Sequence, residues 1–437
     1  MIKEIKNQVA IEEIEKEFEP IIGYKSIKKE LIRICDIMRN PEVYSSLGVS
    51  LPRGVLLSGN PGLGKTLMAN CFIAASGRKS ITCRKDKPDG DFVKHIKSVF
   101  DEAINLAPSI VFLDDLDKFA NGDRYHRNSE EFITVQSCID RIKGKDVFII
   151  ATINDEDNLP ESLLRAGRFD NRITVTAPVG QDAENIIEFY IKKKNFVSDI
   201  DVKTITRLLN GESCATLETV INEAGMYAGF NRKEKIEMED IVKACLRIIH
   251  DAPEKEQPFS QETLRRVALH EAGHAVIAST LEPGSVNFVS VRSHGGNVGG
   301  FTNYYQPEDY WISKKYMENR VITLLGGKAA TEICFADTDV GANSDLRRAF
   351  DVTMRFVDNY CANGFDCWVS DRYTSNRTME NRDMQTALEL EKFYQLAKKI
   401  LLENREFLDK LAAALMQKDI LTGVEVEEIK ATCKKVA

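Results

Sequence analysis

The stretch GVLLSGNPGLGKT, residues 54–66, decides the fold of the first part of the chain. A short apolar run of β-strand character leads into a glycine-rich turn, and a helical pattern follows the turn. Glycines let backbone N–H groups surround phosphate oxygens, and the helix N-terminus adds a favourable dipole. A glycine-rich turn that binds nothing is the weaker interpretation, because a strand and a helix flank it as a P-loop requires. The expected nucleotide-binding residues are Gly59, Asn60, Pro61, Gly62, Leu63, Gly64, Lys65 for the β- and γ-phosphates, and Thr66 for Mg²⁺.

A parallel sheet is expected around this loop. Apolar runs of strand length recur at 55–58, 109–113, 147–153 and 173–176, and helical patterns separate them. Short apolar strands that alternate with helices predict an α/β domain with a parallel sheet and helices on both faces. Its ligand site is expected beyond the carboxyl ends of the strands.

Changes in pattern divide the sequence into five parts. The β signal disappears after about residue 180, and a charged stretch with two prolines, DAPEKEQPF, reads as a linker. The expected parts are a helical extension at 1–17, a large α/β domain at 18–180, a small helical lid at 181–250, the linker at 251–259 and a mainly helical domain at 260–437.

The last of these parts is not uniformly helical. Alternating residues and a glycine-rich turn at 286–305 predict β structure. The polar segment 363–384 predicts a loop, and the last fifty residues, including 386–403, predict helices.

The composition excludes several classes of protein. Lys and Arg number 59 against 67 Asp and Glu, and the net charge of −8 comes without a long basic run, which argues against nucleic acid as a partner. No stretch approaches about 18 uninterrupted apolar residues, and the start of the chain carries no secretory signal. The ten cysteines form no CxxC pair, so we interpret them as reduced thiols and expect a cytoplasmic protein.

Polar residues follow two further strands. SIVFLDDLD ends in carboxylates, and Asp114 is expected beside the P-loop, where Mg²⁺ requires a ligand. Asp115 would then orient the attacking water. Asn154, after VFIIATI, is expected to contact the γ-phosphate or that water, although a turn-forming Asn is the better interpretation of this residue taken alone.

Two arginines lie in LLRAGRFD, at Arg165 and Arg168. An isolated exposed arginine is usually a solvated charge. In an oligomeric NTPase both would instead reach the γ-phosphate bound by a neighbouring copy, an effect worth on the order of 10³–10⁵ in the rate of hydrolysis. The pair therefore predicts a homo-oligomeric ring.

A second motif, HEAGH, lies within the helical pattern LRRVALHEAGHAVIAS. The i, i+4 spacing puts His270 and His274 on one helix face, where both can bind one Zn²⁺, and Glu271 can serve as the general base. Two unrelated histidines are the weaker interpretation, because the chain has six in all. A third ligand is required, and spacing alone does not choose between Glu332, Asp339 and Asp345.

From about residue 18 to the end, the sequence resembles the FtsH-type AAA+ zinc metalloproteases. The resemblance rests on FEPIIGYKSIKKEL, the P-loop segment, LLRAGRFD, LHEAGHAV, LLGGKAATEI and DVGANSDLRRA in one order. It implies an AAA+ P-loop domain with a helical lid, a mainly helical peptidase domain, Zn²⁺, ATP or ADP with Mg²⁺, and a hexameric ring that acts on protein or peptide substrates. It also implies that Asp345 is the third zinc ligand and that GGFTNYY, 299–305, binds an extended substrate at its edge.

Three features depart from the family pattern. Most members carry Glu where this chain has Asp115, and a water misplaced by about 1 Å can lower a rate on the order of 10²-fold. The substrate-gripping aromatic of the family falls near Pro88, in KDKPDGDFVKH; Phe92 is a substitute, although a core position at the start of the next helix is the better interpretation. Family members usually carry transmembrane segments before the ATPase domain, so a membrane is expected as a partner only if an anchor has been removed.

Three functions fit these observations. The first is an ATP-dependent zinc endopeptidase that unfolds, translocates and cleaves proteins inside a ring. The second is a zinc peptidase with ATP-gated assembly but weak translocation. The third is a nucleotide-dependent remodelling scaffold with little proteolysis.

Overall fold

The computed structural model places most of the chain in two compact units. The units comprise residues 1–194 with 211–219, and residues 195–210 with 220–437. Within the described residues, no helix is both long and apolar enough to cross a membrane. The structure describes residues 11–48, 52–86, 89–120, 129–165, 167–252, 260–292, 299–305, 313–337, 340–369 and 374–433.

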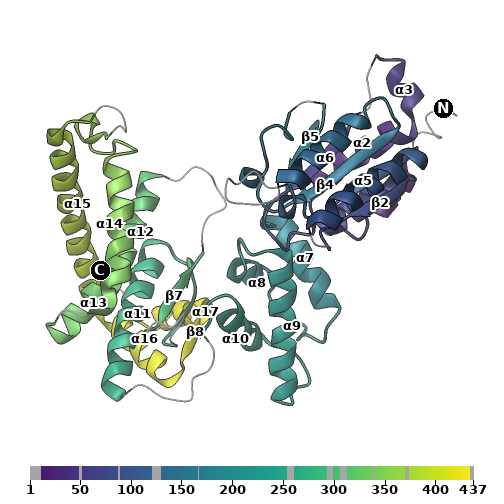
Figure 1. The fold of residues 1–437 in the computed structure, drawn as a ribbon. Helices are drawn as coiled ribbons and strands as arrows, with labels where there is room; N and C mark the ends of the chain where they lie inside the picture. The colour runs from purple at the N-terminus through teal and green to yellow at the C-terminus, as the bar shows by residue number, and fades with distance from the viewer. Residues whose placement is uncertain are drawn as a thin grey trace. The chain divides into compact units, whose positions relative to one another are not determined.

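A five-stranded parallel sheet forms the centre of the first unit, which confirms the predicted fold class (Figure 1). The strands lie in the order β2-β3-β4-β1-β5. Three of them, β1, β3 and β4, are buried along their whole length, which explains their apolar sequence. Their bounds are β1 Gly54–Ser58, β2 Lys79–Cys83, β3 Ser109–Leu113, β4 Val147–Ile153 and β5 Asn171–Thr174.

Strand β2 has no counterpart among the predicted strands. It lies at the edge of the sheet, and of its five residues only Cys83 is buried. An exposed edge strand needs no apolar run, so KSITC gives no strand signal in the sequence.

Helices cover both faces of this sheet. On one face the Phe72 ring of α4 lies 5.5 Å from the ring of Phe148 in β4. On the other, the next residue, Ile149, belongs to a buried cluster with residues of α5 and α6. Neighbouring side chains of a strand point to opposite faces, so the sheet is buried on both sides. The helices are α2 Lys25–Arg39, α3 Pro41–Ser45, α4 Lys65–Ser76, α5 Asp89–Asn105 and α6 Ser129–Arg141.

Four helices follow the sheet in sequence, as the lid prediction requires. α8 is capped by the Asp201 side chain, which accepts a hydrogen bond from the backbone N–H of Lys203, and α10 begins with a capping box of Glu237 and Asp240. The boundaries of the lid stay a prediction. The helices are α7 Gly180–Lys192, α8 Val202–Leu208, α9 Cys214–Phe230 and α10 Met238–Ile248.

The rest of the chain is mainly helical around a three-stranded antiparallel sheet of order β7-β6-β8. Strands β6 and β7 lie where the sequence predicts β structure. The elements are α11 Gln261–Leu281, β6 Val286–Ser290, β7 Phe301–Tyr304, α12 Lys314–Leu324, α13 Gly326–Phe335, α14 Asn343–Val357, α15 Asn376–Glu403, α16 Arg405–Gln417, β8 Ile420–Thr422 and α17 Gly423–Ala431.

Two predictions for this part are wrong. Residues 376–384 belong to α15 rather than to a loop, because Ser375 caps the helix by accepting a hydrogen bond from the backbone N–H of Thr378. Their polar composition reflects exposure, since the buried residues of α15 begin at Thr386. Residues 420–422 form β8 rather than a helix, because they pair with β6 at the edge of the sheet. Three residues are too few to interrupt a helical pattern in the sequence.

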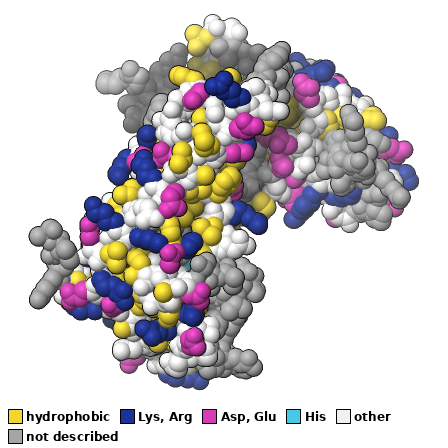
Figure 2. All heavy atoms as spheres, turned by 90° about the vertical axis from the view of Figure 1, so that its left-hand side faces the viewer, with side chains coloured by type: hydrophobic (Ala, Val, Ile, Leu, Met, Phe, Trp, Pro, Cys, Tyr) yellow, Lys and Arg dark blue, Asp and Glu magenta, His cyan; other side chains and the backbone are white. Residues whose placement is uncertain are grey.

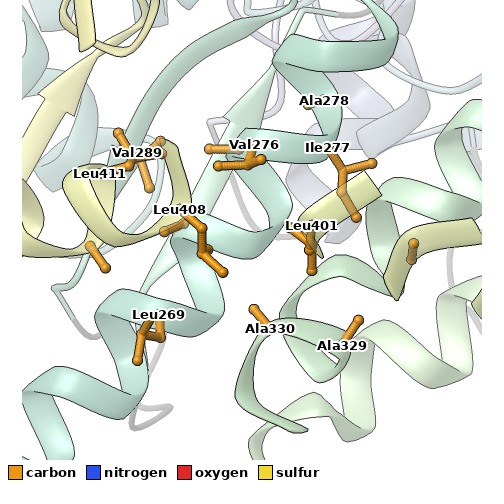
Figure 3. Packing of buried hydrophobic residues seen from close by; sticks show 14 of the residues in the cluster. Leu269, Val276, Ile277, Ala278, Val289, Ala329, Ala330, Leu401, Leu408 and Leu411 are labelled. Atoms are coloured by element: carbon orange, nitrogen blue, oxygen red, sulfur yellow. The ribbon is translucent and has the colours of Figure 1, made fainter. Parts of the chain in front are cut away.

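Helix α11 runs through the middle of the second hydrophobic core (Figure 3). Val276, Ile277 and Leu269 of α11 pack with Ala329 and Ala330 of α13 and with apolar residues of α15 and α16. Apolar residues cover several sides of this helix, because other elements surround it. The packing holds the central turns of α11 in a fixed position.

The buried position of Phe92 generates a test of the fold. Its ring is fully buried in α5 and meets Phe119 edge-on at 5.1 Å. Phe92→Ala should lower the free energy of unfolding of the first unit by about 3–5 kcal/mol, because it leaves a cavity. Ile133→Ala, at an α6 side chain of the same unit that is 60% exposed, is the control and should change little. Calorimetric unfolding measures both; a Phe92→Ala protein as stable as the control would contradict the core position.

Candidate functional site

The two histidines of HEAGH and one distant aspartate meet in the second unit. α11 begins at a Ser260 cap and keeps His270 and His274 one turn apart, with their Nε2 atoms separated by 3.1 Å. Asp345, in the first turn of α14, brings Oδ2 to 3.2 Å from His270 Nε2 and 3.3 Å from His274 Nε2. The ligand atoms of the three residues lie within 4.8 Å of one another. Two imidazole nitrogens and one carboxylate oxygen at this separation fit Zn²⁺.

The other two candidates for the third ligand differ in their surroundings. Glu332 accepts hydrogen bonds from Lys398 Nζ at 2.5 Å and Lys328 Nζ at 3.1 Å. These bonds, together with one from the Tyr394 hydroxyl, hold the pKa of Glu332 at about 2. Its carboxylate is thus already engaged by two ammonium groups. Asp339 lies outside the described residues.

Gly327 leaves room above the two imidazoles. A Cβ at this position would lie 2.4 Å from His270 Nε2 and 2.6 Å from His274 Nε2. Its neighbour Gly326 faces Gly273 of α11, where a Cβ would lie 2.5 Å from the Gly326 carbonyl oxygen. The glycines therefore let α13 approach α11 at the turn that carries the histidines, and the space over the ring nitrogens is one that a methyl group would fill.

Hydrogen bonds orient the groups around this site. His274 Nδ1–H donates to the Thr323 carbonyl at 2.8 Å, which leaves Nε2 available to a metal. Glu271 is 5% exposed and accepts a hydrogen bond from the Thr302 hydroxyl at 2.8 Å. Burial raises the pKa of Glu271 above its usual value, although the two histidines oppose that rise. A carboxylate with increased proton affinity suits the role of a general base.

The P-loop lies between β1 and α4, and Lys65 contacts backbone and side-chain oxygens there. Lys65 Nζ donates to the carbonyls of Gly59 at 2.6 Å and Asn60 at 2.9 Å, and to Asn154 Oδ1 at 3.0 Å. Burial lowers the pKa of Lys65, although three nearby carboxylates, that of Asp115 first, oppose the change. The structure therefore brings Lys65 and Asn154, 89 residues apart, to one point.

The acidic end of β3 lies beside Thr66. Asp114 Oδ1 accepts hydrogen bonds from the hydroxyls of Thr66 at 3.1 Å and Thr152 at 2.9 Å. Thr152 also accepts from the backbone N–H of Asp115, whose φ is 54°. Asp115 Oδ2 lies 2.5 Å from Lys118 Nζ, so the carboxylate expected to orient water already has a cationic partner.

The two candidate finger arginines differ in their surroundings. Arg165 is exposed. The side chain of Arg168 is only 13% exposed, and its guanidinium pairs with Asp140 at 2.7 Å and donates to the Ser162 carbonyl. Of the two, Arg165 is the more accessible to another molecule.

The segment that replaces the family's aromatic loop is only partly described. Pro88 lies outside the described residues. Phe92 is in the core, as its sequence context favours.

Four further residues contribute to the two sites but were not predicted from the sequence. They are Gly327, Thr323 and Thr302 at the histidine site and Thr152 at the P-loop site. Only the paired glycines of LLGGKAATEI could have signalled a close helix contact.

Fold and site together define a P-loop ATPase joined to a HExxH zinc peptidase. Residues 55–177 match the model of the ATPase family associated with various cellular activities (AAA), and residues 257–429 match peptidase family M41. The chain is 30% identical to ATP-dependent zinc metalloprotease FtsH 2 of Thermoanaerobacter sp. (strain X514), a match that covers 94% of this chain and 82% of that protein.

Two further relatives are also named as ATP-dependent zinc metalloproteases of the FtsH type. Identity is 31% to FtsH 2 of Phytoplasma mali, over 97% of this chain and 64% of that protein, and 30% to FtsH of Helicobacter pylori, over 94% and 70%. The chain thus spans about two thirds of the length of these two. It belongs to the FtsH family of ATP-dependent zinc metalloproteases. Its cofactors are accordingly Zn²⁺ and ATP with Mg²⁺.

The space above Gly327 yields a prediction about zinc. Gly327→Ala should weaken zinc binding by about 10–100-fold, because the methyl group displaces the imidazoles. Gly229→Ala, at a helical glycine with open space around it, is the matched control and should bind zinc normally. Zinc titration against a competing chelator measures both variants. Equal affinities would show that the glycine is not required.

The short side chain of Asp115 yields a prediction about ATP turnover. Asp115→Glu should raise the rate constant of ATP hydrolysis by up to about 10²-fold, because the added methylene extends the carboxylate toward the phosphates. Asp115→Asn should lower it, and both variants should bind ATP like the wild type. Steady-state ATPase assays provide the comparison. A slower Glu variant would mean that Asp115 is already the better-placed carboxylate.

Proposed function

We propose that this chain is an ATP-dependent zinc metalloendopeptidase that unfolds, translocates and hydrolyses protein substrates in a homo-oligomeric, hexameric ring. The observation that carries the proposal is the convergence of His270, His274 and Asp345 beside the buried Glu271, on the same chain as a P-loop with Lys65. Family membership supports it.

The peptidase residues have distinct roles in this proposal. His270, His274 and Asp345 hold zinc. When bound, zinc would act as a Lewis acid that makes water nucleophilic and polarises the peptide carbonyl. Glu271 accepts the proton of the attacking water and delivers it to the leaving amine. Thr302 keeps Glu271 in position through their 2.8 Å hydrogen bond. Strand β7, at one edge of its sheet, offers the edge at which an extended substrate pairs.

In the same proposal, the nucleotide-binding residues drive unfolding and translocation through ATP hydrolysis. Lys65 and Thr66 hold the phosphates and Mg²⁺, with Asp114 beside them, and Asp115 and Asn154 position the attacking water. Arg165 reaches the γ-phosphate of a neighbouring copy, which its exposure permits. Arg168 reaches it as well once it leaves its pair with Asp140.

A surface on the peptidase part supports contact between copies. Leu346 and Phe350 of α14 and Met384 and Leu388 of α15 are exposed apolar residues. Figure 2 shows hydrophobic side chains gathered among charged ones on the side of the molecule where these helices lie. Exposed apolar surface of this kind favours association.

A second function, a zinc peptidase with ATP-gated assembly but weak translocation, is favoured by two specific observations. The carboxylate of Asp115 lies 2.5 Å from Lys118 Nζ and 3.8 Å from an Arg84 nitrogen, which opposes its role in water activation. Phe92 is buried and therefore cannot grip a substrate in this conformation. A scaffold with little proteolysis is the third possibility.

Degradation assays separate these functions. Unfolded casein and a stably folded protein are incubated with the zinc-loaded enzyme and ATP, a non-hydrolysable analogue or no nucleotide. We expect both substrates to be degraded only with ATP. Casein cleavage that is indifferent to hydrolysis would support the gated peptidase, and no cleavage would support the scaffold. Glu271→Gln is the control, which should keep zinc and lower cleavage by at least about 10²-fold.

A further inference from the structure

Strand β7 presents two different faces. Side chains alternate along a strand, so Thr302 and Tyr304 share one face, and Phe301 and Asn303 share the other. On the first face the Thr302 hydroxyl donates to Glu271 Oε2 at 2.8 Å, and Tyr304 packs against the core around α11. The position of Glu271 therefore depends on the position of β7.

The second face of β7 meets His250, two residues after the end of α10. The His250 ring lies 4.7 Å from the Phe301 ring and 5.6 Å from that of Phe288 in β6. Its Nε2 lies 3.4 Å from Asn303 Nδ2. Both ring-to-ring distances fall in the range of attractive aromatic pairs. One side chain thus contacts both Phe301 and Asn303 of the strand.

A second lid residue, Arg207 of α8, contacts the same part of the sheet. Asn303 Oδ1 accepts a hydrogen bond from Asn287 Nδ2 at 2.7 Å, and Asn287 Nδ2 also lies 3.4 Å from the carbonyl oxygen of Arg207 in α8. The Arg207 guanidinium lies over the Tyr305 ring at 5.7 Å. Residues of α8 and of the segment after α10 therefore contact β6, β7 and the residue that follows β7.

A cavity lies next to these contacts. Its volume is about 1030 Å³, and its lining includes Thr204 of α8 and Val242 of α10 on one side and Ile420 of β8 and Glu428 of α17 on the other. Arg207 and Asn287, which contact each other, also line this cavity.

We propose that His250 is a positioning residue for peptide hydrolysis, which couples the lid to the peptidase site. His250 and Arg207 hold the outer face of β7, and β7 holds Glu271 through Thr302. A displacement of the lid during the nucleotide cycle then moves both the substrate-pairing strand and the general base. This inference rests on the proposed function for its catalytic consequence, whereas the contact between His250 and β7 is testable by itself.

Hydrogen exchange of the full chain tests the contact directly. In His250→Ala, the backbone amides of 301–304 should exchange about tenfold faster than in the wild type, because the outer face of the strand loses its support. His250→Phe keeps a ring against Phe288 and Phe301 and should exchange at an intermediate rate. Arg247→Ala is the matched control, since it breaks the 2.6 Å pair with Glu223 inside the lid and should leave β7 unchanged.

Two results would overturn the contact. The first is unchanged exchange at 301–304 in His250→Ala. The second is an equal increase in exchange at 301–304 in His250→Ala and in Arg247→Ala. This result would mean that both substitutions only destabilise the lid in general.

Cleavage of a short unstructured peptide tests the catalytic consequence. His250→Ala should lower kcat by about tenfold, because Glu271 is misplaced, and should raise KM, because the substrate-pairing strand is loosened, with little change in zinc content or ATP hydrolysis. An unchanged kcat would overturn the coupling even if the strand loosens. If the wild type cleaves no peptide, the proposed function fails and so does the catalytic part of the inference, whereas hydrogen exchange still decides the contact.

Discussion

Helices α11 and α13 approach each other through glycines, and the peptidase site depends on this approach. A side chain at Gly273 would meet the Gly326 carbonyl, and one at Gly327 would meet both imidazoles. Helix pairs with ordinary side chains at their contact lie about 8–10 Å apart, so glycines at the crossing allow a closer approach. α13 then forms a rigid wall beside the ring nitrogens, while Thr323, just before it, fixes the tautomer of His274. The core around α11 keeps this arrangement in place.

The nucleotide site follows a related principle at the ends of a parallel sheet. Asp114 follows β3, Asn154 follows β4 and the P-loop follows β1, and these strands are neighbours in the sheet although they are distant in sequence. The order of the strands therefore brings Lys65, Asp114 and Asn154 together. In both sites a rigid scaffold fixes the polar groups before any ligand binds, which limits the reorganisation that catalysis requires.

The sequence predicted the parts of the structure that depend on local pattern. The P-loop, HEAGH and the buried strands β1, β3 and β4 were predictable, because spacing and apolar runs express them directly. Strands β2 and β8 were not, since one is an exposed edge strand and the other has three residues. Spacing also left three candidates for the third ligand; packing brings Asp345 to His270 across 75 residues, and Glu332 instead pairs with Lys398. The contact of His250 with β7 arises only in three dimensions.

X-ray absorption at the zinc edge tests the central claim, that His270, His274 and Asp345 hold the metal, most directly. For the zinc-loaded full chain we predict a first shell of nitrogen and oxygen only, at about 2.0–2.2 Å, with outer scattering from two imidazoles. Replacement of Asp345 by Ala should leave both imidazole signals. A sulfur ligand at about 2.3 Å, or fewer than two imidazoles, would contradict the assignment and place zinc at another site.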